Sequence, residues 1–178
     1  MQTSVALRIL AAFAVATLPL TAAAQTPSPA ATPKPCSTAQ DRQFDFWLGK
    51  WTVADPSGVA QGTNEITSEL GGCVLQEHWV GAGGTSRGSS FNHYDAARKV
   101  WHQTWVDDSG GILQLDGTWH DGAMVLSGDR PGRGGVTITD RITFTPRTDG
   151  TVRQFWQVSR DHGATWTTSF DGIYRRSS

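Results

Sequence analysis

The polar residues of this chain that are best suited to bind a ligand or to take part in a reaction lie beside tryptophans in short extended segments. Residues 99–107 are the clearest example. Side chains of a β-strand alternate between its two faces, so one face of this segment carries Trp101, Gln103, Trp105 and Asp107. Leaving indoles in water would forgo about 25 cal/mol per Å² of apolar surface. We therefore expect this face to point into the protein and to bring an amide and a carboxylate with it.

The segment at residues 75–79 repeats this combination, because Leu75, Glu77 and Trp79 share one face. A buried carboxylate or amide without partners loses about 2 kcal/mol or more. An interior that holds such groups therefore needs other polar groups, water or a ligand beside them.

Indoles next to a few amides and charged groups suit a small hydrophobic or amphipathic ligand, which would stack on the rings and form a few hydrogen bonds. The alternative is that the polar groups pair with one another inside a filled interior, with Arg141 neutralising Asp107 or Glu77. The candidate ligand-binding residues are Trp51, Glu77, Trp79, Asn92, Trp101, Gln103, Trp105, Asp107, Arg141, Gln154 and Trp156.

The inward face of two segments, residues 136–145 and 151–159, stays open. Arg141 lies on one face of the first segment, whereas the apolar alternative for that segment is formed by Val136, Ile138, Ile142 and Phe144. In the second segment, Gln154 and Trp156 share the face that we take as the inward one.

The sequence offers little for catalysis or metal binding. Its five histidines show no His-x-His or His-x-x-x-His spacing, so a zinc or iron site would have to assemble from separate strands. Glu77 and Asp107 could form the carboxylate pair of a hydrolase, although their separation does not follow from the sequence. We predict a binding protein without a catalytic, metal or cofactor site. Two alternatives remain: a hydrolase or haem-dependent enzyme, and a structural or partner-binding envelope protein with a filled interior.

The first 24 residues have the order of a secretory signal: one basic residue, Arg8, then an apolar segment at 9–20 and small residues up to Ala24. The apolar segment is shorter than the roughly 20 residues that a membrane span needs, and no later segment reaches that length. We expect cleavage after Ala24, a periplasmic or secreted product, and no membrane insertion afterwards. Residues 25–40, rich in Pro, Ala and Thr, predict a disordered leader, and residues 41–178 a single domain.

The two cysteines, Cys36 and Cys73, predict a disulfide in an oxidising compartment, which would contribute about 2 to 4 kcal/mol. The alternative is two unpaired thiols. A net charge of -1 and the lack of a basic cluster argue against nucleic acid or an anionic membrane as partner. The expected partner is a small molecule, and a homodimer is left open.

Short extended segments alternate with turn signals at intervals of about ten residues, which is typical of an all-β meander. Asp-Gly and Gly-rich pairs between the segments favour tight hairpins. We expect about ten strands, and because an open sheet would expose two edges, we expect it to close into an up-and-down antiparallel barrel with a cavity. The strands should begin near residues 47, 62, 73, 86, 99, 112, 123, 136, 152 and 165.

Two shorter patterns predict local structure. Residues 44–53 are expected to form the first strand, with Trp47, Gly49, Trp51 and Val53 on its inward face. Residues 159–166 match the Asp-box pattern Ser-x-Asp-x-Gly-x-Thr-Trp, in which the aspartate binds the backbone of a hairpin turn and the tryptophan packs beneath it. A single copy indicates a structural hairpin, with His162 exposed in the turn.

The Gly49-x-Trp51 pair near the start of the strands resembles the first strand of the calycin barrels. That resemblance implies a tryptophan that plugs the closed end of the barrel and an arginine from the last strand across it, for which Tyr174-Arg175-Arg176 offers candidates. The combined motifs at residues 44–51, 72–77, 90–95, 103–107 and 170–174 are similar to the DUF1579 proteins, a calycin-like group of exported bacterial proteins. This similarity implies a barrel and no particular activity.

A more distant similarity connects the chain with the nitrobindins, which are ten-stranded barrels that bind haem through a histidine near the C-terminus. This chain has no histidine after His162, and its last strand offers Tyr174 instead. The resemblance therefore implies the fold without the haem ligand.

Overall fold

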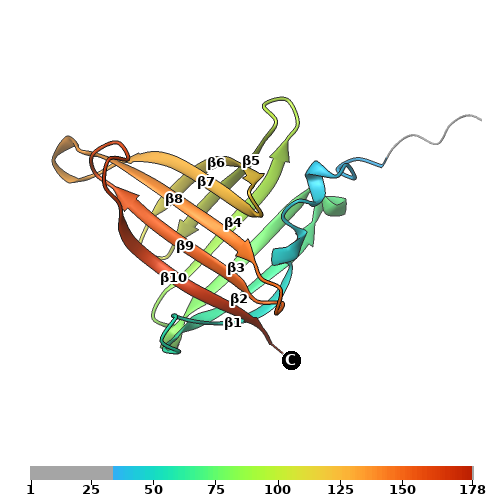
Figure 1. Ribbon diagram of the computed structural model, residues 1–178, viewed down its shortest axis with the longest axis horizontal. Coiled ribbons are helices and arrows are strands. Elements are labelled where there is room, and N and C mark those ends of the chain that lie inside the picture. Colours follow the sequence, from blue (N-terminus) through green and yellow to red (C-terminus); the bar gives the residue numbers. More distant parts are fainter. Residues whose placement is uncertain (1–33, 178) are drawn as a thin grey trace, which may run out of the picture. The chain divides into compact units, whose positions relative to one another are not determined.

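Ten antiparallel strands close into one up-and-down barrel, as the sequence predicts, in a computed structural model that describes residues 34–177. Each strand pairs with its neighbours in the chain, and β1 pairs with β10 to close the wall (Figure 1). The predicted signal segment and most of the predicted leader lie outside the described residues. The strands are β1 Gly49–Ala54, β2 Ala60–Glu69, β3 Val74–Gly81, β4 Arg87–Asp95, β5 Val100–Asp107, β6 Ile112–His120, β7 Ala123–Pro131, β8 Thr137–Pro146, β9 Val152–Ser159 and β10 Thr167–Arg176.

Turn chemistry sets the ends of these strands, and each of β2 to β10 begins within about two residues of its predicted start. Between β5 and β6, the Asp107 carboxylate accepts hydrogen bonds from the backbone nitrogens of Ser109 and Gly111, each at 2.9 Å. Gly122 and Gly150 take the positive φ that the turns before β7 and β9 require. Within residues 34–177 there are also five single-turn 3-10 helices: η1 Gln40–Arg42, η2 Asp45–Trp47, η3 Leu70–Gly72, η4 Ala82–Gly84 and η5 Arg133–Gly135.

The predicted first strand is wrong at its start. Residues 45–47 form η2, and the strand begins only at Gly49, opposite Ile66. The β1–β2 ladder ends at this pair although β2 continues to Glu69, and the chain before Gly49 turns beneath the barrel. This turn buries Phe44 and Trp47 completely. We call these two side chains the plug.

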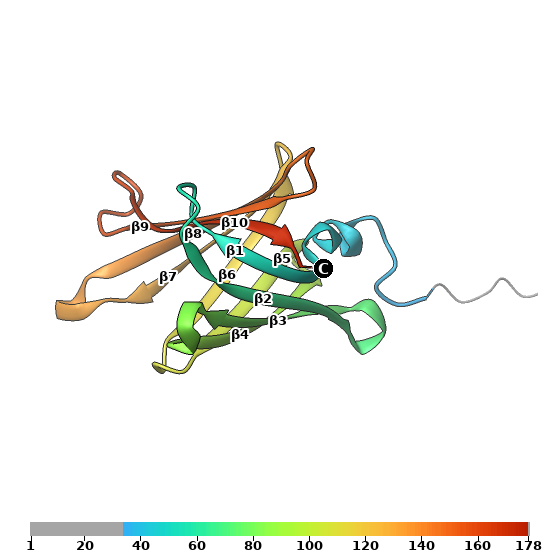
Figure 2. The same ribbon diagram turned by 90° about the horizontal axis from the view of Figure 1, so that it is seen from below.

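The segment that carries the plug lies at the barrel end at which β1 begins and β10 ends, next to the C-terminus (Figure 2). Phe44 and Trp47 stack with their ring centroids 5.0 Å apart, and both rings contact Phe144 of β8. The indole nitrogen of Trp51 donates to the Trp47 carbonyl at 2.8 Å.

An arginine of the last strand lies across the plugged end, as the calycin resemblance implies. The Arg176 guanidinium lies 4.4 Å from the centre of the Trp51 ring, a cation–π contact. Its Nη1 also donates to the Leu48 carbonyl at 2.9 Å. The two ends of the barrel sheet are therefore joined by side chains as well as by the β1–β10 ladder.

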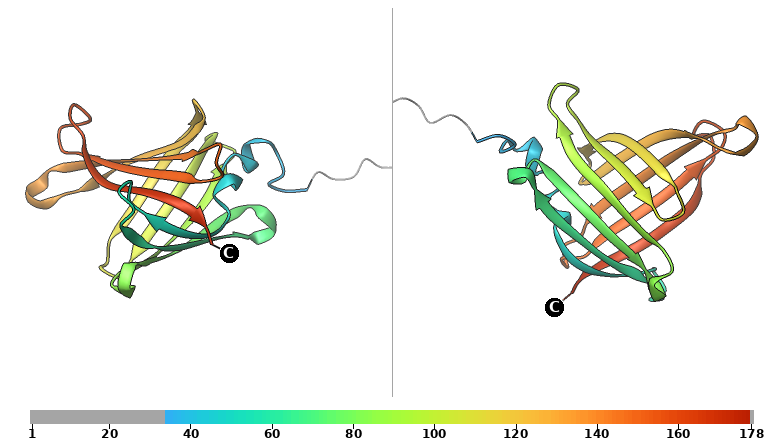
Figure 3. Two further views of the ribbon diagram at one scale, coloured as in Figure 1. Left: turned by 60° about the horizontal axis from the view of Figure 1, so that its bottom comes forward. Right: turned by 180° about the vertical axis from the view of Figure 1, so that it is seen from behind.

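The predicted disulfide between Cys36 and Cys73 is present. It connects the segment before the plug to the residue that follows η3. Arg42 reinforces this connection, because its guanidinium donates to the carbonyls of Cys36 and Gly72 and pairs with Asp45. Figure 3 shows the 34–48 segment beside the β2–β3 turn.

The Asp-box hairpin between β9 and β10 also has the predicted structure. The Asp161 carboxylate accepts from the backbone nitrogen and the hydroxyl of Thr165, and these bonds lower the pKa of Asp161 to about 2. Trp166 folds back under the turn, with its indole nitrogen donating to the Gly163 carbonyl at 3.0 Å. His162 is exposed, with a positive φ. No helix among residues 34–177 is long and apolar enough to cross a membrane.

Candidate functional site

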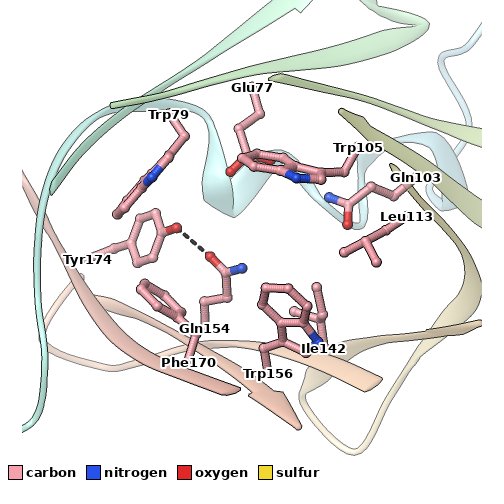
Figure 4. Close-up of a pocket in the computed structure, with 10 residues that line it drawn as sticks. All are labelled: Glu77, Trp79, Gln103, Trp105, Leu113, Ile142, Gln154, Trp156, Phe170 and Tyr174. Carbon is pink, nitrogen blue, oxygen red and sulfur yellow. Dashed lines mark hydrogen bonds between the residues drawn. The ribbon is translucent and has the colours of Figure 1, made fainter. Parts of the chain in front are cut away.

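The interior is packed near the plug and hollow at the opposite end, which we call the mouth. Trp51, Trp101, Met124, Leu126 and Phe144 fill the plugged half and are essentially inaccessible to solvent. Toward the mouth a pocket of about 120 Å³ remains. Figure 4 shows the side chains that surround it: Glu77, Trp79, Gln103, Trp105, Leu113, Ile142, Gln154, Trp156, Phe170 and Tyr174.

Four half-buried aromatic side chains form the walls of this pocket, Trp79 from β3, Trp105 from β5, Trp156 from β9 and Phe170 from β10. Trp79 and Phe170 meet edge to face with centroids 5.8 Å apart. We call these four residues the aromatic walls. They contribute the large apolar surface that a stacked ligand ring would need.

Carboxylates at the mouth hold two of the indoles in place. The Trp156 nitrogen donates to Asp140 at 2.8 Å, and the Trp105 nitrogen donates to Asp107 at 3.3 Å. Asp140 is itself paired with Arg130 at 2.7 Å. Because both N–H groups are already bonded to the wall, the rings can offer a ligand mainly their apolar surface.

Glycines make room for the aromatic walls, either on the neighbouring strand or, for Phe170, on the same strand. A Cβ at Gly88 would overlap the Trp105 ring, and one at Gly172 would overlap Phe170. Gly62 stands in the same relation to Trp79. The rings of Trp105 and Trp79 therefore lie across the adjacent strand, and the ring of Phe170 lies along its own strand, which keeps the pocket open.

Polar side chains form a floor between the aromatic walls and the packed half, and Glu77 is at its centre. Glu77 is 4 % exposed, and its two oxygens accept hydrogen bonds from Asn64 Nδ2 at 2.7 Å and Ser90 Oγ at 2.6 Å. Ser90 in turn accepts from Asn92 Nδ2 at 2.8 Å, and Gln103 donates to Asn92 Oδ1 at 2.8 Å. The polar side chains of this layer are therefore hydrogen-bonded to one another, as the alternative of paired interior groups predicts, whereas the pocket above them is not filled by side chains.

The other side of the floor is formed by Tyr174 and Gln154. The Tyr174 hydroxyl accepts from Asn64 at 3.2 Å and donates to the Gln154 carbonyl oxygen (Figure 4). Burial and the neighbouring Glu77 raise the pKa of Tyr174 well above 10, so the phenol stays neutral. We call Glu77, Asn64, Ser90, Asn92, Gln103, Gln154 and Tyr174 the polar floor.

Burial raises the pKa of Glu77 from 4.5 to about 7, because desolvation outweighs the two hydrogen bonds that favour its charged form. The described residues place no Lys, Arg or His within ion-pair distance of this carboxylate. Glu77 therefore changes charge near neutral pH in an otherwise uncharged layer.

This titration predicts a stability change with pH. The raised pKa stabilises the folded chain fully below pH 4.5, and that contribution disappears as the pH rises through 7. The full loss is about 3 kcal/mol by proton linkage. Urea unfolding at pH 4 and pH 8 measures the free energy of unfolding at each pH. Between these pH values the wild type should lose about 3 kcal/mol more than the Glu77→Gln variant loses. Equal pH dependence in both proteins would contradict the buried titration.

The structure places six of the predicted ligand-binding residues in the pocket: Glu77, Trp79, Gln103, Trp105, Gln154 and Trp156. Trp51 and Trp101 face inward but lie in the packed half, and Asn92 lies in the polar floor without lining the pocket. Asp107 stands at the mouth, where turn hydrogen bonds occupy it and lower its pKa. It thus orients Trp105 instead of forming a carboxylate pair with Glu77.

Arg141 was predicted to be inside, and this is wrong. Ile142, Phe144 and Asp140 of β8 point inward, so Arg141 lies on the outer face. There it donates to Gln157 at 2.9 Å and stacks 3.9 Å from the Trp166 ring. The charged residue of β8 that points into the barrel is Asp140, which pairs with Arg130.

Several site residues were missed by the sequence analysis. Phe170 and Tyr174 share the inward face of β10, and Gly172 between them marks that face. Leu113 and Ile142 line the pocket as well, and Asn64 and Ser90 bind Glu77. Strict alternation along β2, β4, β6, β8 and β10 would have identified all of these residues as inward-facing.

Two other chemical possibilities find no support in the described residues. Residues 84–88 spell Gly-x-Ser-x-Gly, the pattern of the serine-hydrolase nucleophile, but Ser86 stands between η4 and β4 and no helix follows it. Residues 34–177 contain no group of three His, Cys, Asp or Glu side chains placed to hold a metal ion.

No family model matches this chain, and no curated protein matches it either.

Proposed function

We propose that this chain is an exported protein that binds a small aromatic or amphipathic molecule in the mouth pocket. The observation that carries the proposal is the hollow itself, which is walled by four aromatic side chains over a floor of hydrogen-bonding groups. Pockets of this kind hold a ligand by apolar contact and orient it with a few polar groups.

The size of the pocket limits the ligand. A dry cavity of about 150 Å³ is large enough to hold benzene, and this pocket measures about 120 Å³ and continues into the mouth. The pocket is therefore somewhat smaller than that cavity, and a ligand with one aromatic ring and a short polar substituent would extend into the mouth. The secretory signal pattern and the disulfide support export.

Titration calorimetry with benzyl alcohol tests the proposal, because this neutral probe has one ring and one hydroxyl. Trp105→Ala removes a wall and should weaken binding about tenfold, through lost apolar contact and ring packing. Trp166→Ala is the matched control, since it removes an indole from the outer face. The proposal fails if the wild type does not bind, or if both variants lose affinity equally.

A native mass spectrum of freshly purified protein provides a second test. A non-covalent adduct with a mass of one small organic molecule should be present in the wild type and depleted in Trp105→Ala. An adduct of equal intensity in both proteins would place the bound molecule elsewhere.

A further inference from the structure

The buried carboxylate of Glu77 lacks a countercharge. It lines the pocket, is 4 % exposed, and no described Lys, Arg or His lies within 4.0 Å of it. Proteins seldom bury a carboxylate without pairing it, because desolvation of the charge is unfavourable. The missing partner would therefore have to come from the pocket.

The hydrogen bonds of the polar floor are directed toward Glu77. Ser90 Oγ accepts from the amide nitrogens of Asn92 at 2.8 Å and Gln103 at 3.4 Å, which fills both of its acceptor positions. Its single hydrogen therefore goes to Glu77 Oε2. Since Asn64 Nδ2 also donates to Oε1, both oxygens of Glu77 are held as acceptors, the arrangement that suits a charged carboxylate.

The surroundings of this carboxylate are suited to an organic cation. Trp79, Trp105 and Trp156 stand between Glu77 and the mouth, and an indole face attracts a cation more strongly than the other aromatic rings do. The N–H groups of Trp105 and Trp156 are turned to carboxylates of the wall. At the mouth, hydrogen bonds keep Asp107 charged, which also favours the approach of positive ligands.

We propose that the ligand of the mouth pocket is a small organic ammonium ion on an apolar or aromatic body, with its nitrogen against Glu77 and its body between the aromatic walls. This inference rests on the proposed binding function and narrows it to one class of molecule. An ammonium group would supply the absent countercharge and donate to the lone pairs that Asn64 and Ser90 leave free.

A matched pair of probes tests the charge alone. Benzylammonium and benzyl alcohol have the same ring and the same number of heavy atoms, and only the first carries a charge. At pH 8 the wild type should bind benzylammonium about tenfold more tightly than benzyl alcohol, as measured by titration calorimetry.

Glu77→Gln should remove this preference, so that the variant binds benzylammonium no more tightly than it binds benzyl alcohol. The substitution keeps the side-chain volume, and the unpaired Oδ1 of Asn64 can accept from the new amide. Glu65→Gln makes the same change of charge at a Glu that pairs with Lys50, and should keep the preference. A preference that survives in Glu77→Gln would overturn the assignment.

The pH offers a test that needs no variant. Tyr174 is the only other titratable group that faces Glu77 from the packed strands of the described chain, and it stays neutral. The preference for benzylammonium should therefore shrink at pH 5.5, where Glu77 is protonated, and be largest at pH 8.

The outcomes separate the two proposals. Equal affinities for the two probes, or tighter binding of the alcohol, would overturn the ammonium inference and leave the binding function standing. Failure of the wild type to bind either probe would overturn both.

Discussion

Trp51→Ala should lower the free energy of unfolding by about 4 kcal/mol, as expected for removal of a fully buried indole. Trp51 connects three parts of the plugged end. Its nitrogen donates to the Trp47 carbonyl at 2.8 Å, Arg176 lies across its face, and Tyr174 meets its ring edge to face at 6.2 Å. The substitution would leave a cavity whose walls belong to β1, β10 and the plug, and these cannot close without breaking the ladder.

Urea unfolding followed by circular dichroism measures this loss. Trp166→Ala is the control, because that indole lies on the outer face below the Asp-box turn and its removal leaves no interior cavity. We expect the control to lose about 1 kcal/mol. A Trp51→Ala protein as stable as this control would show that the plugged end does not hold the barrel together.

Removal of the disulfide by Cys36→Ala together with Cys73→Ala should cost about 4 kcal/mol, on the chain-entropy estimate for a closed loop of this length. The two cysteines are 37 residues apart, so the crosslink restricts much of the first part of the unfolded chain. In the folded protein it also anchors the segment that carries Phe44 and Trp47. We therefore expect faster hydrogen exchange in residues 40–48 of the variant.

Reductant supplies the control for this experiment. It should lower the urea midpoint of the wild type toward that of the double variant and leave the double variant unchanged. Identical midpoints for oxidised wild type and double variant would contradict the predicted stabilisation.

The strand count, the closure of the barrel and the disulfide could be predicted from the sequence, because local patterns determine them. Asp and Gly residues mark each turn, and the two-residue alternation marks each strand. The start of the first strand could not be predicted this way. Trp47 and Trp51 are both buried and four residues apart, which fits a strand, yet only Trp51 has partners for a ladder.

For the tryptophans of β5 the inward face was predicted correctly, but the depth in the barrel was not. Trp101 and Trp105 lie on the same face of β5, yet one packs in the closed half and the other lines the pocket. Depth depends on the stagger between strands, which sets Gln103 opposite Asn92 and Leu115. That stagger follows from closure of the whole barrel, which no single segment encodes.

Arg141 shows a different limit. Each face of β8 carries one charged residue, but Ile138, Ile142 and Phe144 all share the face of Asp140, so the apolar alternation favoured the orientation that the structure has. Partners on other strands stabilise the carboxylate of Asp140 inside the barrel. Arg130 neutralises Asp140 from β7, and Trp156 donates to it from β9, so the shorter charged side chain is the one that enters.

The plug also determines the path by which a ligand enters and leaves the pocket. Because Phe44 and Trp47 seal one end, a ligand of the proposed kind would enter and leave through the mouth alone and could not pass through the barrel from end to end. A second ligand could enter only after the first had dissociated. The rate at which a second ligand replaces the first would then be limited by the dissociation rate of the first, whatever the concentration of the second.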